Sequence, residues 1–418
     1  MFKDILRTYF FKYISIALTF SSGVLIARFF GPEGKGLASI YLFIPQAVIL
    51  YSEFGLSESI MQFTSKKFNI NKFFLTKFIL ITIFFSISVY YIYIYNFNET
   101  LIQLGILLPT LLFLIFSDQL LVFYTKGKSN FKIFDYNNVI KSFLIFFGVC
   151  LVCFLNFEIL YILYTYLIVY FFSILFLCYF IINNNEVFKK TIDSSQFLKY
   201  SFNTYLFKVL NSTESIFDKL LIVSFLSLSE FGLYSVVVGL SSLLYTVFVN
   251  PISNILLPIL NNKSGYSKIT QVNFFSRVIV LPVFITGIFM IFFSESLIDL
   301  IYGNQFKSTY LVLSILLIGV IVKSPMAVFS YYFKSIGQPK KLVNISIITT
   351  PINIVGGIIL IPKLGILGAA IVSSCTYFLF TLIMVYKYIQ LTDSNFVDMF
   401  IIRNNDIKVI KNKFFNNS

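Results

Sequence analysis

The chain has 418 residues, of which 58% are hydrophobic and 12% charged, with a mean hydropathy of +0.86 and a formal net charge of +14. Ordinary soluble domains are about 45–50% apolar and about 25% charged, so this composition excludes a soluble globular protein. Histidine is absent, which excludes histidine proton relays and most zinc sites. The basic residues lie in short clusters between apolar runs, a pattern of membrane orientation that argues against nucleic-acid binding.

Apolar runs of about 20 residues recur along the chain, and each is long enough to cross about 30 Å of hydrocarbon as a helix. The sequence therefore predicts an all-α integral membrane protein. We expect twelve spans, near residues 10–30, 37–60, 73–95, 101–123, 139–156, 158–182, 198–226, 232–260, 275–293, 310–333, 342–361 and 366–388. The run that contains the first span ends in Arg28 and not at a small-residue cleavage site, which predicts a helix that is retained.

A glycine-rich stretch, Gly31-Pro32-Glu33-Gly34-Lys35-Gly36, separates the first two spans. A phosphate-binding loop of the G-x-x-x-x-G-K-[ST] type needs a hydroxyl after its lysine to hold magnesium, whereas Gly36 follows Lys35 here. We therefore interpret the stretch as a tight turn on the outer side of the membrane and not as a nucleotide site.

Basic residues follow the even-numbered spans, and the intervening loops are poorer in them. By the positive-inside rule this bias places both termini in the cytoplasm. The basic groups that decide the orientation are Lys66, Lys67 and Lys72; Lys126, Lys128 and Lys132; Lys189, Lys190 and Lys199; Lys263, Lys268 and Arg277; Lys334, Lys340 and Lys341; and Arg403, Lys408, Lys411 and Lys413.

The seventh span, 198–226, carries four charges that are expensive in lipid: Lys208, Glu214, Asp218 and Lys219. At about 2.5–3.5 kcal/mol for each charge near a helix centre, they would together cost roughly 10–14 kcal/mol. Without this span, however, every later basic loop would lie outside. We therefore predict that the helix crosses and turns its charges toward other helices or a water-filled cavity.

The longest predicted loop, about 183–197, divides the spans into two sets of six. We expect an N-terminal lobe at 1–190, a C-terminal lobe at 191–390 and a cytoplasmic tail at 391–418. Gly36-Leu37-Ala38-Ser39 has an echo in Gly232-Leu233-Tyr234-Ser235, 196 residues later. Two six-helix bundles with the same orientation predict a parallel repeat about a pseudo-two-fold axis along the membrane normal.

Four stretches resemble a known family, the Wzx-type O-antigen and polysaccharide flippases of the multidrug/oligosaccharidyl-lipid/polysaccharide exporter superfamily. They are ARFFGPEGKGLASIY, SIFDKLLIVSFLSLSEFGLYSV, NPISNILLPIL and SIGQPKKLVNISIITTPINIVGGIILIPKLGILGAAIVSS. The resemblance implies a MATE-like pair of six-helix bundles that open to alternate sides of a bacterial cytoplasmic (inner) membrane. It also implies undecaprenyl-pyrophosphate-linked oligosaccharide repeat units as cargo.

Such a cargo carries concentrated negative charge, so a flippase needs cations inside its cavity. The candidates for substrate binding are Arg28, Lys208, Lys219 and Lys323. Lys208 and Lys219 are eleven residues apart, which on a helix places them within about 20° of one face and about 16 Å apart along the axis. Glu214 and Asp218 are candidates for coupling to Na⁺ or H⁺. An internal salt-bridge network is the equally weighted alternative for these charges.

Other polar residues receive structural interpretations. We expect Glu53, Glu58, Asp118 and Gln119 to lie near a solvated interface, and Asn353 to bond neighbouring helices. Arg28, at the end of its span, can extend outward to water instead of entering the cavity.

The cysteines and prolines receive structural interpretations as well. The pair Cys150 and Cys153 is expected to pack in a core and not to act in redox chemistry. Seven prolines fall inside predicted spans and can kink helices: Pro45, Pro109, Pro251, Pro258, Pro282, Pro325 and Pro351.

Two other functions compete with a flippase. An ion-coupled multidrug antiporter of the same superfamily would suit an acidic or aromatic cavity, whereas the charges here lean cationic. A membrane polysaccharide polymerase or ligase is an enzyme and generally carries a long external catalytic loop, which this chain lacks. We expect no enzyme activity and no cofactor. The expected partners are the lipid-linked oligosaccharide, membrane lipid, a polysaccharide polymerase and chain-length proteins.

Overall fold

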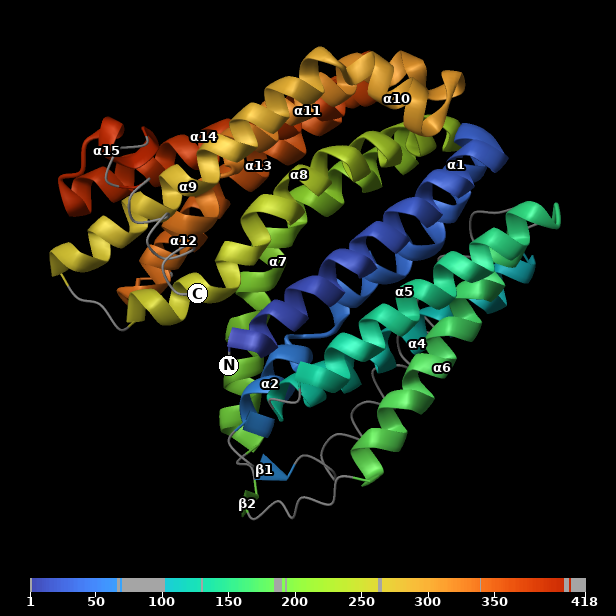
Figure 1. Cartoon of the computed structure of the whole chain (residues 1–418), viewed down its shortest axis with the longest axis horizontal. Helices are drawn as coiled ribbons and strands as arrows, with labels where there is room; N and C mark the ends of the chain where they lie inside the picture. Colours follow the sequence, from blue (N-terminus) through green and yellow to red (C-terminus); the bar gives the residue numbers. More distant parts are fainter. Residues whose placement is uncertain are drawn as a thin grey trace. The chain divides into compact units, whose positions relative to one another are not determined.

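The computed structural model describes residues 2–65, 68–69, 102–128, 131–183, 190–191, 194–261, 265–338, 340–401 and 406. Helices make up nearly all of these residues (Figure 1). Nine helical segments in the described part are long and apolar enough to cross a membrane. The predicted class, an all-α membrane protein that crosses the bilayer many times, is confirmed. The third predicted span, 73–95, lies outside the described residues.

The chain forms two compact units, residues 1–212 and 213–418. Unit 1 contains α1 (Phe2–Ser52), α2 (Leu56–Ser65), α4 (Ile102–Gly127), α5 (Phe131–Phe154), α6 (Leu160–Asn183) and the start of α7 (Ser194–Phe225). Two short parallel strands, β1 (Phe68–Asn69) and β2 (Lys190–Thr191), pair Phe68 with Lys190. Along the chain the boundary between the units falls inside α7, whereas the expected lobe boundary at 190/191 precedes that helix.

Helix α1 contains the first two predicted spans in two limbs joined at Gly31. Gly31 has φ 66° and ψ −169°, a left-handed conformation that glycine adopts without a steric penalty, and Pro32 follows it. A methyl group placed on Gly23 would lie 3.3 Å from the ammonium of Lys35. On a straight helix these two residues would be about 18 Å apart. The chain therefore folds back at Gly31, and the glycine-rich stretch is a turn.

The core of unit 1 lies where α1, α4, α5 and α6 pack together, which Figure 1 shows between blue α1 and green α6. Its fully buried side chains include Leu111, Val149, Ile162 and Leu163. Gly127 lets the end of α4 approach the backbone of α2, because a side chain there would lie 2.7 Å from the carbonyl oxygen of Met61. Gly148 of α5 makes room for the side chain of Thr165 in α6, whose Cγ2 would lie 2.3 Å from an added side-chain carbon.

Unit 2 contains the rest of α7 and the helices that follow it. These are α8 (Leu228–Asn261), α9 (Gly265–Phe292), α10 (Ser294–Tyr302), the 3₁₀ helix η2 (Asn304–Thr309), α11 (Tyr310–Lys323), α12 (Met326–Ser335), α13 (Lys340–Leu364), α14 (Ile366–Thr392) and α15 (Phe396–Phe400). The tenth predicted span is broken between α11 and α12 at Ser324 and Pro325, because proline lacks the backbone N–H that would continue the helix.

Small residues set the close packing of unit 2. A side chain at Gly319 of α11 would collide with Ser374 of α14, and one at Gly368 would collide with the backbone of Leu360 in α13. Helix α14 therefore packs closely against both neighbours. Asn353 of α13 reaches Thr376 of α14 at 3.5 Å, which confirms the predicted bond between helices.

Part of the predicted tail belongs to unit 2 and contacts α9. Arg277 of α9 is buried, and its Nε and Nη2 lie 2.7 and 2.8 Å from the two carboxylate oxygens of Asp406. Its Nη1 donates to the backbone carbonyl of Asp398, in α15. The sequence uses Arg277 as one of the basic residues that orient the chain, at the start of the predicted ninth span, and in the structure residues from the predicted tail cover it.

Candidate functional site

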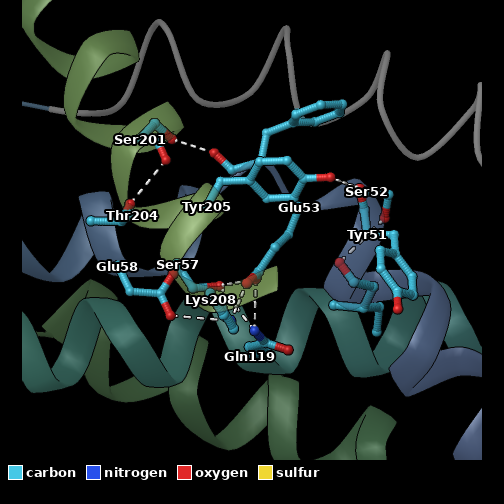
Figure 2. Close-up of polar contacts among 12 residues, drawn as sticks. Tyr51, Ser52, Glu53, Ser57, Glu58, Gln119, Ser201, Thr204, Tyr205 and Lys208 are labelled. Carbon is cyan, nitrogen blue, oxygen red and sulfur yellow. Dashed lines mark hydrogen bonds and ion pairs between the residues drawn. The ribbon is translucent and has the colours of Figure 1, made fainter. Parts of the chain in front are cut away.

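Two polar regions inside the helical units contain most of the residues that the sequence singles out. The first is in unit 1, where α1 ends and α2 begins (Figure 2). Glu53 is fully buried there. Its Oε2 accepts hydrogen bonds from Ser57 Oγ at 2.7 Å and from Gln119 Nε2 at 2.8 Å. Its Oε1 pairs with the ammonium of Lys208.

Lys208 of α7 bridges two carboxylates. Its Nζ contacts Glu53 and lies 3.1 Å from Oε1 of Glu58. The Lys208 and Glu58 side chains are each 25% exposed. The expectation that Glu53 is solvated near an interface was wrong. A buried carboxylate is expensive unless it is paired and hydrogen-bonded, and Lys208 with the two neutral donors supplies that compensation.

The first half of α7 is fixed to the break between α1 and α2. Ser201 Oγ donates to the carbonyl of Phe54 at 2.7 Å, and Tyr205 Oη donates to the carbonyl of Tyr51 at 2.7 Å (Figure 2). These carbonyls lie where α1 ends, so they lack helical partners of their own. Gly55 has φ 70°, and a side chain there would lie 2.2 Å from the Ser201 carbonyl oxygen. The close approach of α7 therefore requires glycine at this position.

A second buried carboxylate of unit 1 is also paired. Lys141 Nζ lies 2.5 Å from Oδ2 of Asp118, and Ser173 Oγ donates to the other oxygen. Asp118 is 4% exposed. The expected solvation of Asp118 was therefore wrong as well. It lies at the meeting point of α4, α5 and α6, and the interaction stabilises their packing.

The second polar region is a cavity in unit 2 with a volume of about 220 Å³. Four helices line it: α7, α8, α11 and α14. Val238, Leu316 and Val320 contribute apolar surface, and the other lining side chains are polar. The polar side chains are Asp218, Lys219, Tyr234, Ser241, Ser242, Tyr245, Thr246, Lys323, Ser373 and Tyr377.

Within the cavity the lysines have distinct surroundings. Lys323 Nζ lies 3.8 Å from the centre of the Tyr377 ring and 5.9 Å from that of Tyr245, which are cation–π distances. Lys219 neighbours Asp218 in sequence, and Asp218 accepts a hydrogen bond from Ser373. The lining therefore holds two ammonium groups, one carboxylate, three tyrosine rings and several hydroxyls.

The structure brings three of the predicted site residues together, Asp218, Lys219 and Lys323. Lys208 belongs to unit 1, and Arg28 lies exposed near the end of the first limb of α1. The side chain of Glu214 lies outside the described residues. The predicted alignment of Lys208 with Lys219 on one face stays a prediction. Among the described residues no three His, Cys, Asp or Glu side chains gather as metal ligands.

Sequence reasoning missed the tyrosines and hydroxyls of the cavity. Tyr234, Tyr245 and Tyr377 resemble the many other aromatic residues of this chain, which has 27 tyrosines. The available signal was helical spacing. Tyr234, Val238, Ser241 and Tyr245 follow one another at three- and four-residue intervals, which marks one face of α8.

Three solved structures share the fold across nearly the whole chain. Lipid II flippase MurJ, in an inward closed conformation, is 18% identical with a TM-score of 0.74, over 98% of this chain and 99% of that one. An inward-facing multidrug resistance MATE family transporter of the MOP superfamily is 14% identical with a TM-score of 0.69, over 90% and 95%. A MOP superfamily transporter of Pyrococcus furiosus is 15% identical with a TM-score of 0.62, over 94% and 97%.

A curated relative is an uncharacterized membrane protein of Methanocaldococcus jannaschii, 26% identical over 141 residues. The match spans 32% of this chain and only 27% of that protein's length. A family model described as polysaccharide biosynthesis protein matches residues 25–311, more than half of the chain. The chain is a multi-pass membrane protein with the fold of the MOP superfamily, and it belongs to the polysaccharide biosynthesis protein family.

Proposed function

We propose that the protein is a flippase that moves undecaprenyl-pyrophosphate-linked oligosaccharide repeat units across the bacterial cytoplasmic membrane by alternating access. The observation that carries the proposal is the cavity of unit 2, where Lys219 and Lys323 line a polar space inside the helical bundle. Charged groups inside membrane proteins are expensive and mark substrate or ion pathways. Membership of a polysaccharide biosynthesis family supports a glycan cargo.

The cations have a physical role in this proposal. A lipid-linked glycan loses the water around its charged and polar groups as it enters the bilayer, and ammonium groups replace part of that hydration. Lys219 and Lys323 are the proposed contacts in unit 2, and Arg28 and Lys208 are proposed contacts of unit 1. Lys208 would exchange Glu53 and Glu58 for the substrate, so its contribution depends on opening of that network.

The energy source in the proposal is an ion gradient. Asp218 is a buried carboxylate that lines the cavity, and Glu214 lies one helical turn before it on α7. Binding of Na⁺ or H⁺ at these carboxylates would change the net charge of the region between loaded and unloaded states. That change couples ion movement to the passage of an anionic substrate.

As a flippase the protein would have a defined orientation in the membrane and defined partners. Both termini lie in the cytoplasm by the positive-inside rule, and the substrate is delivered from the cytoplasmic leaflet. The proposed partners on the other side are a polysaccharide polymerase and the proteins that control chain length. The protein carries out no covalent chemistry on the glycan.

The test is complementation of a deletion strain, with surface polysaccharide as the readout. Wild type is expected to restore the polymer, whereas Lys219→Gln and Lys323→Gln are expected to lower it at equal protein abundance. Lys363→Gln, which changes an exposed lysine at the end of α13, is the matched control and keeps the polymer. If neither wild type nor the control restores the polymer and the deletion alters drug sensitivity, the flippase function is contradicted and a multidrug antiporter is favoured.

A further inference from the structure

The cavity of unit 2 has a chemistry that fits one part of a lipid-linked glycan better than another. It combines two ammonium groups, one carboxylate and three tyrosine rings around about 220 Å³. That volume is below the roughly 300–1,000 Å³ typical of sites for drug-sized ligands. A whole oligosaccharide or a lipid chain therefore exceeds it, and one monosaccharide ring is the matching size.

The net charge of the lining discriminates between the anionic groups of the substrate. Among the lining residues that the structure describes, Lys219 and Lys323 against Asp218 give a net formal charge of +1. One sugar carboxylate neutralises that charge, whereas a pyrophosphate diester carries about two negative charges and would leave an excess in a low-dielectric setting. Two-pronged recognition of phosphate needs the planar fork of arginine, and the described lining contains lysine but no arginine.

The positions of the aromatic rings supply the second argument. Tyr245 of α8 and Tyr377 of α14 both lie at cation–π distance from Lys323, which comes from the end of α11. A tyrosine face attracts the partly positive C–H groups of a pyranose, and its hydroxyl can bond the polar rim of the sugar. Pyrophosphate has no C–H face that would use these rings.

The hydroxyls complete a polar rim around the rings. Ser241 and Ser242 come from α8, and Ser373, from α14, already donates to Asp218. Asp218 can accept hydrogen bonds from sugar hydroxyls, whereas an ionised carboxylate or phosphate of the ligand has no hydrogen to donate to it. Each class of lining group thus has a counterpart on a sugar that carries one carboxylate.

From these observations we propose that the cavity of unit 2 is a recognition subsite for an acidic sugar, a pyranose with a single carboxylate, within the transported glycan. Lys323 binds the carboxylate, Tyr377 and Tyr245 flank the ring, and Asp218 with the serines bonds the hydroxyls. The subsite rests on the proposed flippase function and adds to it the class of sugar that the protein selects.

Saturation-transfer NMR on the purified full-length chain in detergent tests the subsite. The probes are methyl β-glucuronide, methyl β-glucoside as its neutral analogue and inorganic pyrophosphate. We expect the glucuronide to bind and the glucoside to bind at least about tenfold more weakly, because it lacks the charged hydrogen bond. Lys323→Gln is expected to lose that preference, Lys323→Arg to keep it, and Tyr377→Leu to weaken both sugars. Lys363→Gln serves as the control.

Binding of pyrophosphate in competition with the glucuronide at equal or higher affinity would overturn the sugar assignment, as would equal binding of the two sugars. The absence of glucuronide binding to a folded wild type would also overturn it. The complementation experiment separates the two proposals. If wild type restores surface polymer while no glucuronide binds, only the subsite fails. If wild type restores none, the flippase proposal fails first.

Discussion

At the scale of single residues, the buried charges of unit 1 form matched sets. Glu53 is fully buried with Lys208, Ser57 and Gln119 around it, and Asp118 has Lys141 and Ser173. Each carboxylate thus receives at least one ammonium and one neutral donor. Because removing one member of a buried pair leaves the other uncompensated, such a set costs more to break than it contributes when whole.

The first prediction concerns the pair of Glu53 and Lys208. Glu53→Gln and Lys208→Met should each lower the thermal unfolding midpoint of the purified protein. The free energy of unfolding should fall by on the order of 3–5 kcal/mol, as when one partner of a buried pair is removed. The double variant should lose less than the sum, because neither change then leaves a charge uncompensated. Differential scanning fluorimetry with a thiol-reactive dye provides the measurement, since the chain has four cysteines and no tryptophan.

Glu33→Gln is the control for that experiment, because Glu33 is exposed in the turn of α1. Its free energy of unfolding should match that of wild type within about 0.5 kcal/mol, as for most surface substitutions. Strictly additive losses at Glu53 and Lys208 would contradict the coupling.

The sequence could reveal that these charges are unusual but not how they are satisfied. Glu53 and Lys208 are separated by 155 positions, so no local pattern links them. The expectation of a solvated interface followed from sequence position near the end of a span, and it failed because burial depends on which helix packs there. Tyr377 and Lys323 pose the same difficulty, since only the fold brings α14 beside α11.

At the scale of elements, glycines at helix breaks set where helices come together. Gly31 reverses α1, and Gly55 lets α7 approach the end of α1. The first of these was readable from the sequence, because glycine followed by proline between two apolar runs is a local turn signal. The second was not, because the collision that excludes a side chain involves Ser201, far along the chain.

The second prediction compares two glycines with positive φ. Gly55 (φ 70°) faces Ser201 and Thr204, whereas Gly265 (φ 52°) has no atom within 4 Å of the place a side chain would take. Gly265→Ala should cost only the backbone strain, about 1–2 kcal/mol. Gly55→Ala should lower the midpoint further or reduce the yield of folded protein. Equal effects in thermal unfolding would contradict the close approach of α7.

The third prediction concerns α15, which Arg277 of α9 holds in place within unit 2. Arg277→Lys loses the two-pronged contact with Asp406, because an ammonium cannot reproduce the planar fork. We expect limited proteolysis to cleave the variant after residue 392 faster than wild type, with α9 to α14 intact. Lys363→Gln should match wild type. Equal cleavage rates of Arg277→Lys and wild type would show that other contacts hold α15.

At the scale of the whole molecule, composition alone determines the class, whereas the predicted count of twelve spans stays a prediction beside the nine candidates in the described part of the chain. Apolar runs are local, so α4, α5, α6, α8, α9, α13 and α14 fall near the predicted ranges. Helix α7 is the exception. Its crossing of the membrane stays a prediction, since it is not among the spanning candidates found in the described part of the chain. Lys208 of α7 lies in the network of unit 1, and Asp218 and Lys219 line the cavity of unit 2, so these three charges face other helices or a cavity, as predicted.

The measurement that tests the central claim most directly is translocation in reconstituted vesicles. Purified protein is placed in vesicles with an undecaprenyl-pyrophosphate-linked oligosaccharide, and the sugar reached by a membrane-impermeant glycosidase is followed over time. A flippase predicts that wild type exposes sugar from the inner leaflet, that Lys323→Gln slows this markedly and that Lys363→Gln does not. Vesicles with folded wild type that expose no more sugar than protein-free vesicles would contradict the account.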